Sequence, residues 1–156
     1  MVSEERLSSL MKGRGLTLSL AESCTGGMIS SRITDIPGSS AFFLGSVVSY
    51  AYASKMSLLK VRPETLERCG AVSAEAAEEM SAGAADAFRS DVSAAVTGIA
   101  GPSGGSKDKP VGLVFISVRY GNKVTTTRNV FKGSREEIRA AASDAVIAAI
   151  MKAVER

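Results

Sequence analysis

The sequence predicts a single α/β domain in which a mixed sheet lies between two layers of helices. Three observations favour this three-layer fold. The length of 156 residues is typical of one domain and is enough to bury a core. Strand patterns alternate with helical patterns, and a hairpin followed by a long helix completes the chain. No internal repeat or linker interrupts the sequence, so we expect one domain over residues 1–156.

The amino-terminal segment has a helix–strand–helix pattern. Residues 4–14 repeat apolar side chains at helical spacing, and a glycine follows them. Residues 16–21 alternate leucine with threonine or serine, which is typical of a strand. The polar segment ESCTGG at residues 22–27 comes next, and residues 28–34 predict a helix of about two turns.

The remaining elements follow from local signals of the same kind. Residues 36–40 are expected to form a loop, and residues 43–52, rich in valine and tyrosine, predict a second strand. Ser73 is a favourable N-cap, and Gly121 with Asn122 suits a two-residue hairpin turn. The other elements expected are helices over residues 54–60, 63–68, 74–88 and 135–156, the last opened by a capping box of Ser134 and Glu137, and strands over residues 92–97, 111–120 and 123–131.

The sequence contains no histidine, and this absence restricts the possible chemistry. It excludes Ser-His-Asp and Cys-His catalytic arrangements and nearly all common zinc sites. The two cysteines, Cys24 and Cys69, are far apart and too few to hold zinc alone, so we expect neither a metal nor a disulfide. Any general base must be lysine, tyrosine, aspartate or glutamate.

Composition also argues against several classes of partner. The net charge is only +3, from 19 basic and 16 acidic residues spread along the chain, and there are few aromatic residues. We therefore expect no nucleic-acid partner. No apolar run reaches the roughly 18 residues of a membrane span, and MVSEERLSSL does not resemble a signal peptide. The chain is expected to be cytoplasmic and to form a homo-oligomer, a dimer or larger.

The segment ESCTGG joins a predicted strand to a predicted helix. Amide groups at the start of a helix favour an anion, and Gly26 with Gly27 would let a ligand approach the backbone. Ser23 and Thr25 add hydroxyl groups. The alternative is that these residues only cap the helix and form a tight turn, since the segment matches neither common phosphate-loop signature.

A second glycine-rich segment, TGIAGPSGG, follows the buried strand pattern of residues 92–97. Its four glycines, which include Gly98 and Gly101, exceed the needs of a short connection. A flexible surface loop is the alternative. Two such loops after two core strands favour a binding site for a small phosphate-bearing ligand, because ligands bind beyond strand ends in such sheets.

Three further groups of residues have both a functional and a structural interpretation. A serine near PGSS at residues 37–40 could be activated by a lysine such as Lys55, although spacing alone cannot pair the two. Cys24 could be a nucleophile at a helix start, but a small buried cysteine is the simpler interpretation. Arg135 and Arg139 share a helical face that is either solvated or a phosphate clamp.

Three long motifs resemble the CinA C-terminal domain family, whose enzymatic members are nicotinamide mononucleotide deamidases (PncC type). They occur in the family's order, and the resemblance covers nearly the whole chain: LAESCTGGMISSRITDIPGSSAFFLGSVVSYAYASK, GAVSAEAAEEM and TGIAGPSGGSKDKPVGLVFISV. Compared with full-length CinA proteins, we expect this chain to lack their N-terminal domain and its activity.

The resemblance implies hydrolysis of the carboxamide of nicotinamide mononucleotide, giving nicotinate mononucleotide and ammonia without a metal or cofactor. It implies a Ser/Lys mechanism, with Ser40 as nucleophile and Lys55 as base. Tyr50 and Ser23 match supporting polar residues of the catalytic group. The substrate-binding positions implied by the motifs and loops are Thr25, Gly26, Gly27, Thr97, Gly98, Gly101 and Arg139.

Two other functions remain open from the sequence. The same pocket could bind a nucleotide or similar metabolite without catalysis, with Lys55 acting only as a phosphate partner. The family's association with competence and DNA damage also suggests an interaction protein, although the small net charge and few aromatic residues argue against direct DNA contact.

Overall fold

A computed structural model of the chain describes residues 3–156 and gives an α/β fold built on one five-stranded sheet. Residues 1 and 2 of the predicted domain lie outside the described part. The helices are α1 (Ser3–Arg14), α2 (Met28–Thr34), α3 (Tyr52–Leu59), α4 (Pro63–Cys69), α5 (Ala74–Phe88) and α6 (Arg135–Glu155), with a short 3₁₀ turn, η1, at Ser39–Ala41. The strands are β1 (Leu18–Glu22), β2 (Phe43–Val48), β3 (Val92–Gly98), β4 (Leu113–Tyr120) and β5 (Lys123–Val130).

The sheet is mixed, with strand order β2-β1-β3-β4-β5. Strands β1, β2 and β3 run parallel, and β4 and β5 form an antiparallel hairpin beside them. Tyr120 pairs with Lys123 across the hairpin, so Gly121 and Asn122 form its two-residue turn. The predicted mixed sheet and hairpin are therefore confirmed.

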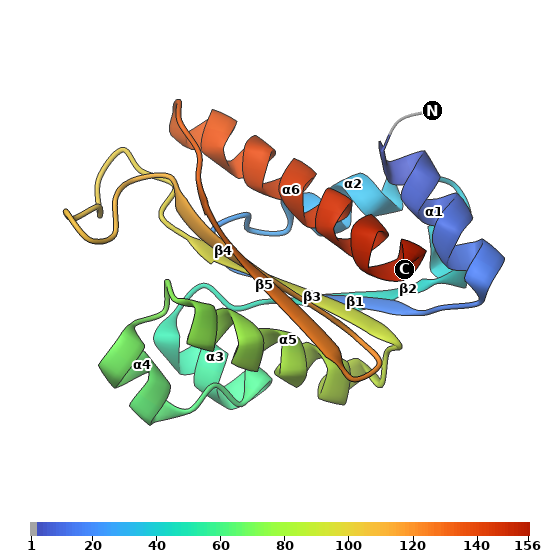
Figure 1. Cartoon of the computed structure of the whole chain (residues 1–156), viewed down its shortest axis with the longest axis horizontal. Coiled ribbons are helices and arrows are strands. Elements are labelled where there is room, and N and C mark those ends of the chain that lie inside the picture. Colours follow the sequence, from blue (N-terminus) through green and yellow to red (C-terminus); the bar gives the residue numbers. More distant parts are fainter. Residues whose placement is uncertain (1–2) are drawn as a thin grey trace.

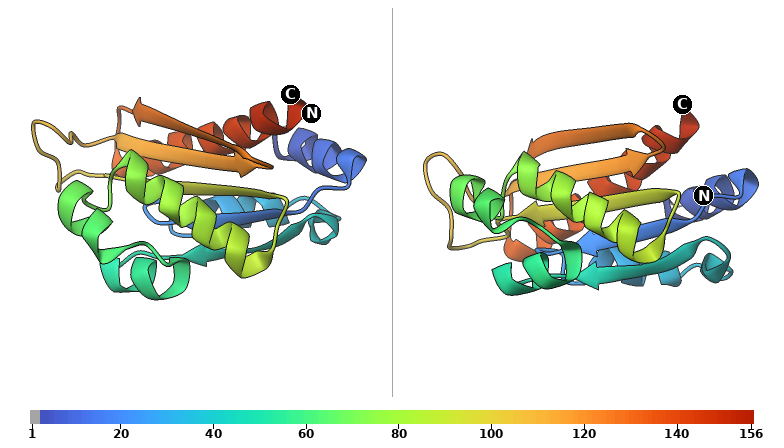
Figure 2. Two further views of the ribbon diagram at one scale, coloured as in Figure 1. Left: turned by 60° about the horizontal axis from the view of Figure 1, so that its bottom comes forward. Right: turned by 90° about the horizontal axis from the view of Figure 1, so that it is seen from below.

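Helices cover both faces of the sheet, which makes the three-layer arrangement visible in Figure 1. Helices α1, α2 and α6 pack on one face, where Met11, Ile33 and Val146 join a core with residues of β1, β3 and β4. Helices α3, α4 and α5 lie on the other face, as the two views of Figure 2 also show. This second core is smaller and centres on Leu59 and Met80.

The local cap signals of the sequence are also present. Ser73 accepts a hydrogen bond from the amide of Ala76, and Ser134 with Glu137 forms a full capping box at the start of α6. Strand β2 is shorter than the predicted segment 43–52, because the chain leaves the sheet after Val48 and begins helix α3 at Tyr52. Within residues 3–156, no helix is long and apolar enough to cross a membrane.

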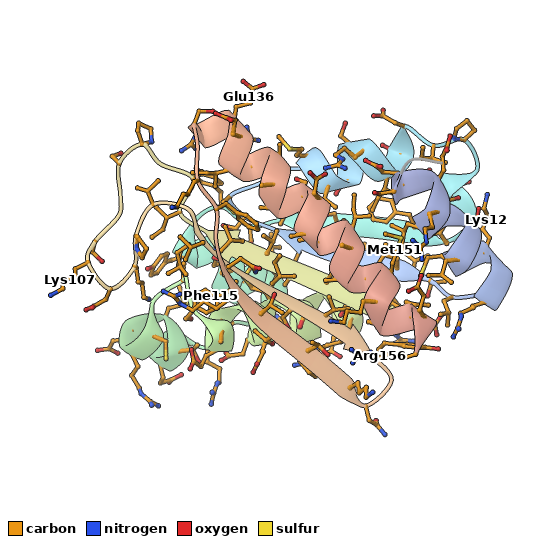
Figure 3. All side chains as sticks on the ribbon, turned by 45° about the horizontal axis from the view of Figure 1, so that its top comes forward. Lys12, Lys107, Phe115, Glu136, Met151 and Arg156 are labelled. Carbon is orange, nitrogen blue, oxygen red and sulfur yellow. The ribbon has the colours of Figure 1, made fainter. Side chains whose placement is uncertain are left out.

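The parallel strands determine where a site can form, since their carboxyl ends meet at one edge of the sheet. Glu22, Val48 and Gly98 end these three strands. The long connection from β3 to β4 extends beyond the same edge, and the start of α6 lies above it (Figure 1). Figure 3 shows Lys107 at the tip of that connection and Glu136 in the first turn of α6, both at this end of the molecule.

Candidate active site

Lys55 and Ser23 form a buried pair at the carboxyl edge of the sheet. Ser23 directly follows β1, and Lys55 lies on α3, one turn after its start. Lys55 Nζ donates to Ser23 Oγ at 2.9 Å. Its other acceptors are the carbonyl oxygens of Ser49, at 2.6 Å, and Tyr50, at 3.4 Å. A lysine and a serine 32 positions apart in the sequence are thus in direct contact.

The environment of Lys55 makes its amine easier to deprotonate than a free lysine. The side chain is only 1% exposed, and none of the ion pairs formed by residues 3–156 includes it. Burial lowers the pKa of Lys55 from 10.5 to about 8, because desolvation disfavours the charged form; the nearby Cys24 acts in the opposite direction but does not outweigh burial. A neutral amine can donate its two protons to the two carbonyl oxygens and use its lone pair to accept a proton from Ser23.

Ser40 lies at the other end of β2 from Lys55, and the predicted proximity of these two residues is wrong. Ser40 is exposed in the turn η1, before β2 begins, whereas Lys55 comes after β2 ends. Six strand residues separate the two ends, which is about 20 Å of extended chain. Figure 2 shows α3 and the turn that precedes β2 at opposite ends of this strand. The structure therefore pairs Lys55 with Ser23 and not with Ser40.

The Lys55–Ser23 pair opens into a cleft of about 180 Å³. Residues from five parts of the chain line it: Ser23, Cys24, Tyr50, Lys55, Ala71, Val72, Thr97, Gly98, Ala100 and Arg135. A larger cleft of about 340 Å³ lies over α4 and α5, but its charged residues include pairs such as Arg62 with Glu79. Only the smaller of these two clefts holds a serine beside a buried lysine.

The start of α2 is not free to bind a phosphate. The carboxylate of Glu22, which is fully buried, accepts from the amides of Gly27, Ile29 and Ser30 at 3.2, 3.1 and 2.9 Å. The chain thus supplies its own anion at the place where the sequence suggested a ligand. Thr25, Gly26 and Gly27 form the turn around this carboxylate and are absent from the cleft lining, so the capping interpretation is observed for these three residues, whereas Ser23 and Cys24 line the cleft.

Arg135 bridges the mouth of the cleft. Its guanidinium donates to the carbonyl oxygen of Gly101 at 2.8 Å and to the hydroxyl oxygen of Tyr50 at 3.0 Å. Tyr50 itself is 63% exposed, so its phenol lies at the rim of the cleft. Only its backbone carbonyl oxygen accepts a hydrogen bond from Lys55. Arg135 is therefore the cationic side chain that the structure brings to the cleft mouth.

Arg139 and Thr97 support the walls of the site. Arg139 donates to the carbonyl oxygens of Cys24 and Thr25 at 3.0 and 2.9 Å, which places it behind the turn and outside the cleft lining. Thr97 lines the cleft and donates from its hydroxyl to the carbonyl oxygen of Ala71 at 2.8 Å. This bond ties β3 to the segment that enters α5.

Sequence comparison identifies the family. The family description "CinA C-terminal domain" matches residues 2–154. The chain belongs to the CinA C-terminal domain family. A CinA-like protein of Geotalea uraniireducens is 51% identical over 133 residues, which are 85% of this chain and 32% of that protein. A CinA-like protein of Fusobacterium nucleatum is also 51% identical, over 80% of this chain and 30% of its own length. The chain spans about a third of the length of these relatives.

Solved structures of the CinA superfamily share the whole fold. The competence/damage inducible protein CihA from Agrobacterium tumefaciens has a TM-score of 0.92 at 38% identity and covers 100% of this chain and 98% of its own. A CinA superfamily protein from Klebsiella pneumoniae has a TM-score of 0.94 at 32% identity, over 99% of both chains. The resemblance read from the motifs is thus confirmed for family and fold.

In this CinA domain, Cys24 does not have the environment of a reactive thiol. The side chain is 6% exposed, and burial raises its pKa to about 11, although a backbone hydrogen bond and the charges of Lys55 and Arg139 act in the other direction. A thiol is nucleophilic only as thiolate, so this environment disfavours Cys24 as the attacking group. Across residues 3–156, no group of three histidine, cysteine, aspartate or glutamate side chains is arranged to hold a metal ion.

Two residues of the site escaped the sequence-based prediction. The sequence indicates Glu22 only as part of a polar segment and gives no role to Ser49, whose carbonyl oxygen accepts from Lys55. The signal for Glu22 was its position immediately before a glycine turn and a helix. A carboxylate at this position can fold back onto the helix amides, as a capping side chain does.

Proposed function

We propose that this CinA domain is an amidohydrolase that converts nicotinamide mononucleotide to nicotinate mononucleotide and ammonia, with Ser23 as nucleophile and Lys55 as base. The observation that carries this proposal is the 2.9 Å contact between Lys55 Nζ and Ser23 Oγ, made by a buried lysine that pairs with no acidic side chain of residues 3–156. In a chain without histidine, such a pair provides both the nucleophile and the base that acyl transfer needs.

The proposed reaction balances with these two side chains and one water molecule. Ser23 Oγ attacks the amide carbon while its proton passes to Lys55 Nζ. The protonated amine then gives this proton to the leaving nitrogen, so ammonia departs and an ester to Ser23 remains. Water then attacks the ester while Lys55 takes one of its protons and passes it to Ser23 Oγ as that oxygen leaves. The nicotinic acid group formed releases its remaining proton to solvent, which gives the carboxylate and free Ser23. The cationic pyridinium of the substrate withdraws electrons from the amide and so assists the attack.

The dimensions of the cleft suggest how the substrate would lie. Its volume of about 180 Å³ is below the ~300–1,000 Å³ of pockets that enclose a drug-sized ligand, so the amide end would enter and the phosphate would stay at the mouth. Arg135 lines the mouth and could exchange its contacts with Tyr50 and Gly101 for the phosphate. The start of α2 does not offer this place, because Glu22 already occupies its amides.

The proposal is tested by measuring ammonia release from nicotinamide mononucleotide by the purified protein, with identification of nicotinate mononucleotide as the second product. Nicotinamide riboside lacks the phosphate and should react at least about tenfold less efficiently, given the usual strength of hydrogen bonds to charged groups. Lys55→Met is the control for contaminating amidases. Binding of the mononucleotide without ammonia release would instead support a non-catalytic nucleotide-binding module.

A further inference from the structure

Glu22 contributes two different contacts to the site, one from its side chain and one from its backbone. Its side chain lies on the α2 face of β1, fully buried, and its carboxylate reaches the turn that follows Ser23. Its carbonyl oxygen accepts from the amide of Ser49 at 2.8 Å. Ser49 in turn provides the carbonyl oxygen, 2.6 Å away, that holds Lys55 Nζ. Glu22 is therefore connected to both members of the proposed catalytic pair.

The carboxylate of Glu22 is surrounded by hydrogen-bond donors alone. Oε1 accepts from the Thr25 hydroxyl at 2.6 Å and from the amides of Gly27 and Ile29. Oε2 accepts from both the amide and the hydroxyl of Ser30, at 2.9 and 2.5 Å. A carboxylate only accepts, so it satisfies every one of these donors, whereas a glutamine would direct its NH₂ group at some of them.

The turn between Ser23 and α2 is held from two sides. Glu22 binds its hydroxyl and amide groups from within the protein, and Arg139 binds the carbonyl oxygens of Cys24 and Thr25 from outside. Gly26, at φ +60°, passes close to Arg139, because a Cβ there would lie 3.3 Å from the guanidinium. The direction of Ser23 is set by this fixed turn, since Ser23 sits between the end of β1 and the turn itself.

We propose that Glu22 is a positioning residue that aims Ser23 Oγ at Lys55 Nζ by using its carboxylate as an internal anion at the start of α2. The inference rests on the proposed role of Ser23 as nucleophile. The inference goes beyond that role because Glu22 lies outside the cleft lining and would act only through the turn. A misplacement of about 1 Å in a reacting group can cost on the order of 100-fold in rate, so Glu22→Gln should lower the reactivity of Ser23 by about that factor.

The test measures Ser23 reactivity without depending on the natural substrate. A fluorophosphonate forms a phosphorus–oxygen bond to a nucleophilic serine and releases fluoride, while the serine proton passes to the base, so intact mass gives the labelling rate. The wild-type protein should be labelled at Ser23, and Ser23→Ala should not. Glu22→Gln should label about 100-fold more slowly. Thr25→Val keeps most of the cap and should label about tenfold more slowly, because it loses one hydrogen bond to a charged group.

Glu79→Gln is the matched control. Glu79 also caps a helix start, accepting from the Arg62 amide at 2.8 Å and the Thr65 hydroxyl at 2.5 Å, but it lies in the other cleft. It should lose thermal stability as Glu22→Gln does, yet label at the wild-type rate. Because Thr25→Val disturbs the fold least, it keeps the test decisive if Glu22→Gln does not fold.

The outcomes separate this inference from the proposed function. Labelling of the wild type without ammonia release would contradict the deamidase and leave the role of Glu22 standing. If folded Glu22→Gln or Thr25→Val is labelled as fast as the wild type, the role of Glu22 is overturned. It is also overturned if the fluorophosphonate does not label the wild-type protein. With active enzyme, kcat for ammonia release should fall in Glu22→Gln while KM changes by less than about threefold, as expected when an interaction needed only for the chemical step is lost.

Discussion

Lys55 is the residue on which the pH dependence of the proposed reaction depends. Its pKa, lowered by burial to about 8, means that the amine carries a proton below that pH and cannot accept one from Ser23. The value of kcat/KM should therefore rise with pH through an apparent pKa of about 8 and level off above it.

Lys55→Arg should reduce kcat/KM at least about 100-fold at every pH, because arginine keeps the charge but does not deprotonate in proteins. Lys60→Arg, on the exposed end of the same helix segment, is the matched control and should behave as the wild type. Near-normal turnover in Lys55→Arg would show that Lys55 supplies only charge, and the base would then have to be sought elsewhere.

Cys24 lies beside Ser23 but should contribute little to the chemistry. Its buried thiol, with a pKa raised to about 11, is protonated at neutral pH. Cys24→Ala should therefore keep kcat/KM within about threefold of the wild type, since only a small apolar contact is lost. Rapid inactivation by iodoacetamide in step with labelling of Cys24 would be incompatible with this assignment.

Most elements could be predicted because their signals are local. The capping box at Ser134, the hairpin turn at Gly121 and the periodicity of α1 need no knowledge of distant residues. The end of β2 could not be predicted in this way. Valine and tyrosine have high strand propensity, so the pattern continued to residue 52, whereas the chain turns after Val48 to begin the helix that carries Lys55.

The packing of α3 against α5 offers a test at the level of the elements. A Cβ at Gly83, in α5, would lie 2.0 Å from the carbonyl oxygen of Leu59, at the end of α3. Gly83→Ala should therefore push the two helices apart and lower the free energy of unfolding by about 1–3 kcal/mol. It should also lower activity, because α3 carries Lys55.

Gly13→Ala is the matched control for this packing prediction. Gly13 also lies in a helix, and nothing is within 4 Å of the position of its added Cβ. This variant should be unchanged or more stable by up to about 1 kcal/mol, because alanine favours helices. If Gly83→Ala is as thermally stable as the wild type, α3 and α5 can separate without cost, and the prediction from their close contact is wrong.

At the scale of the whole molecule, the sequence predicts where the site lies better than it predicts which residues form it. Three parallel strands place their carboxyl ends at one edge, and both glycine-rich segments follow such ends, so the cleft lies where the pattern indicated. Ser40 precedes β2 and so belongs to the opposite edge, which the strand direction alone could have revealed. The contact between Ser23 and Lys55 depends on how α3 packs, and no spacing rule gives it.

Other expectations at this scale stay predictions. A homo-oligomer, a dimer or larger, is still expected, and its mass in solution can be measured by light scattering. The pyridine nucleotide as partner is tested by the ammonia assay described above, and the expected absence of a cofactor or metal requirement is tested by repeating that assay with a chelator. None of these properties follows from the fold, because one fold supports many functions.

The most direct test of the account is a comparison of two serines at opposite ends of the sheet. Ammonia release from nicotinamide mononucleotide should be measured as kcat/KM for the wild type, Ser23→Ala and Ser40→Ala. Loss of the nucleophile should lower kcat/KM by at least about a thousandfold in Ser23→Ala. Ser40→Ala changes an exposed turn and should match the wild type. Full activity in Ser23→Ala together with loss of activity in Ser40→Ala would contradict the Ser23–Lys55 site.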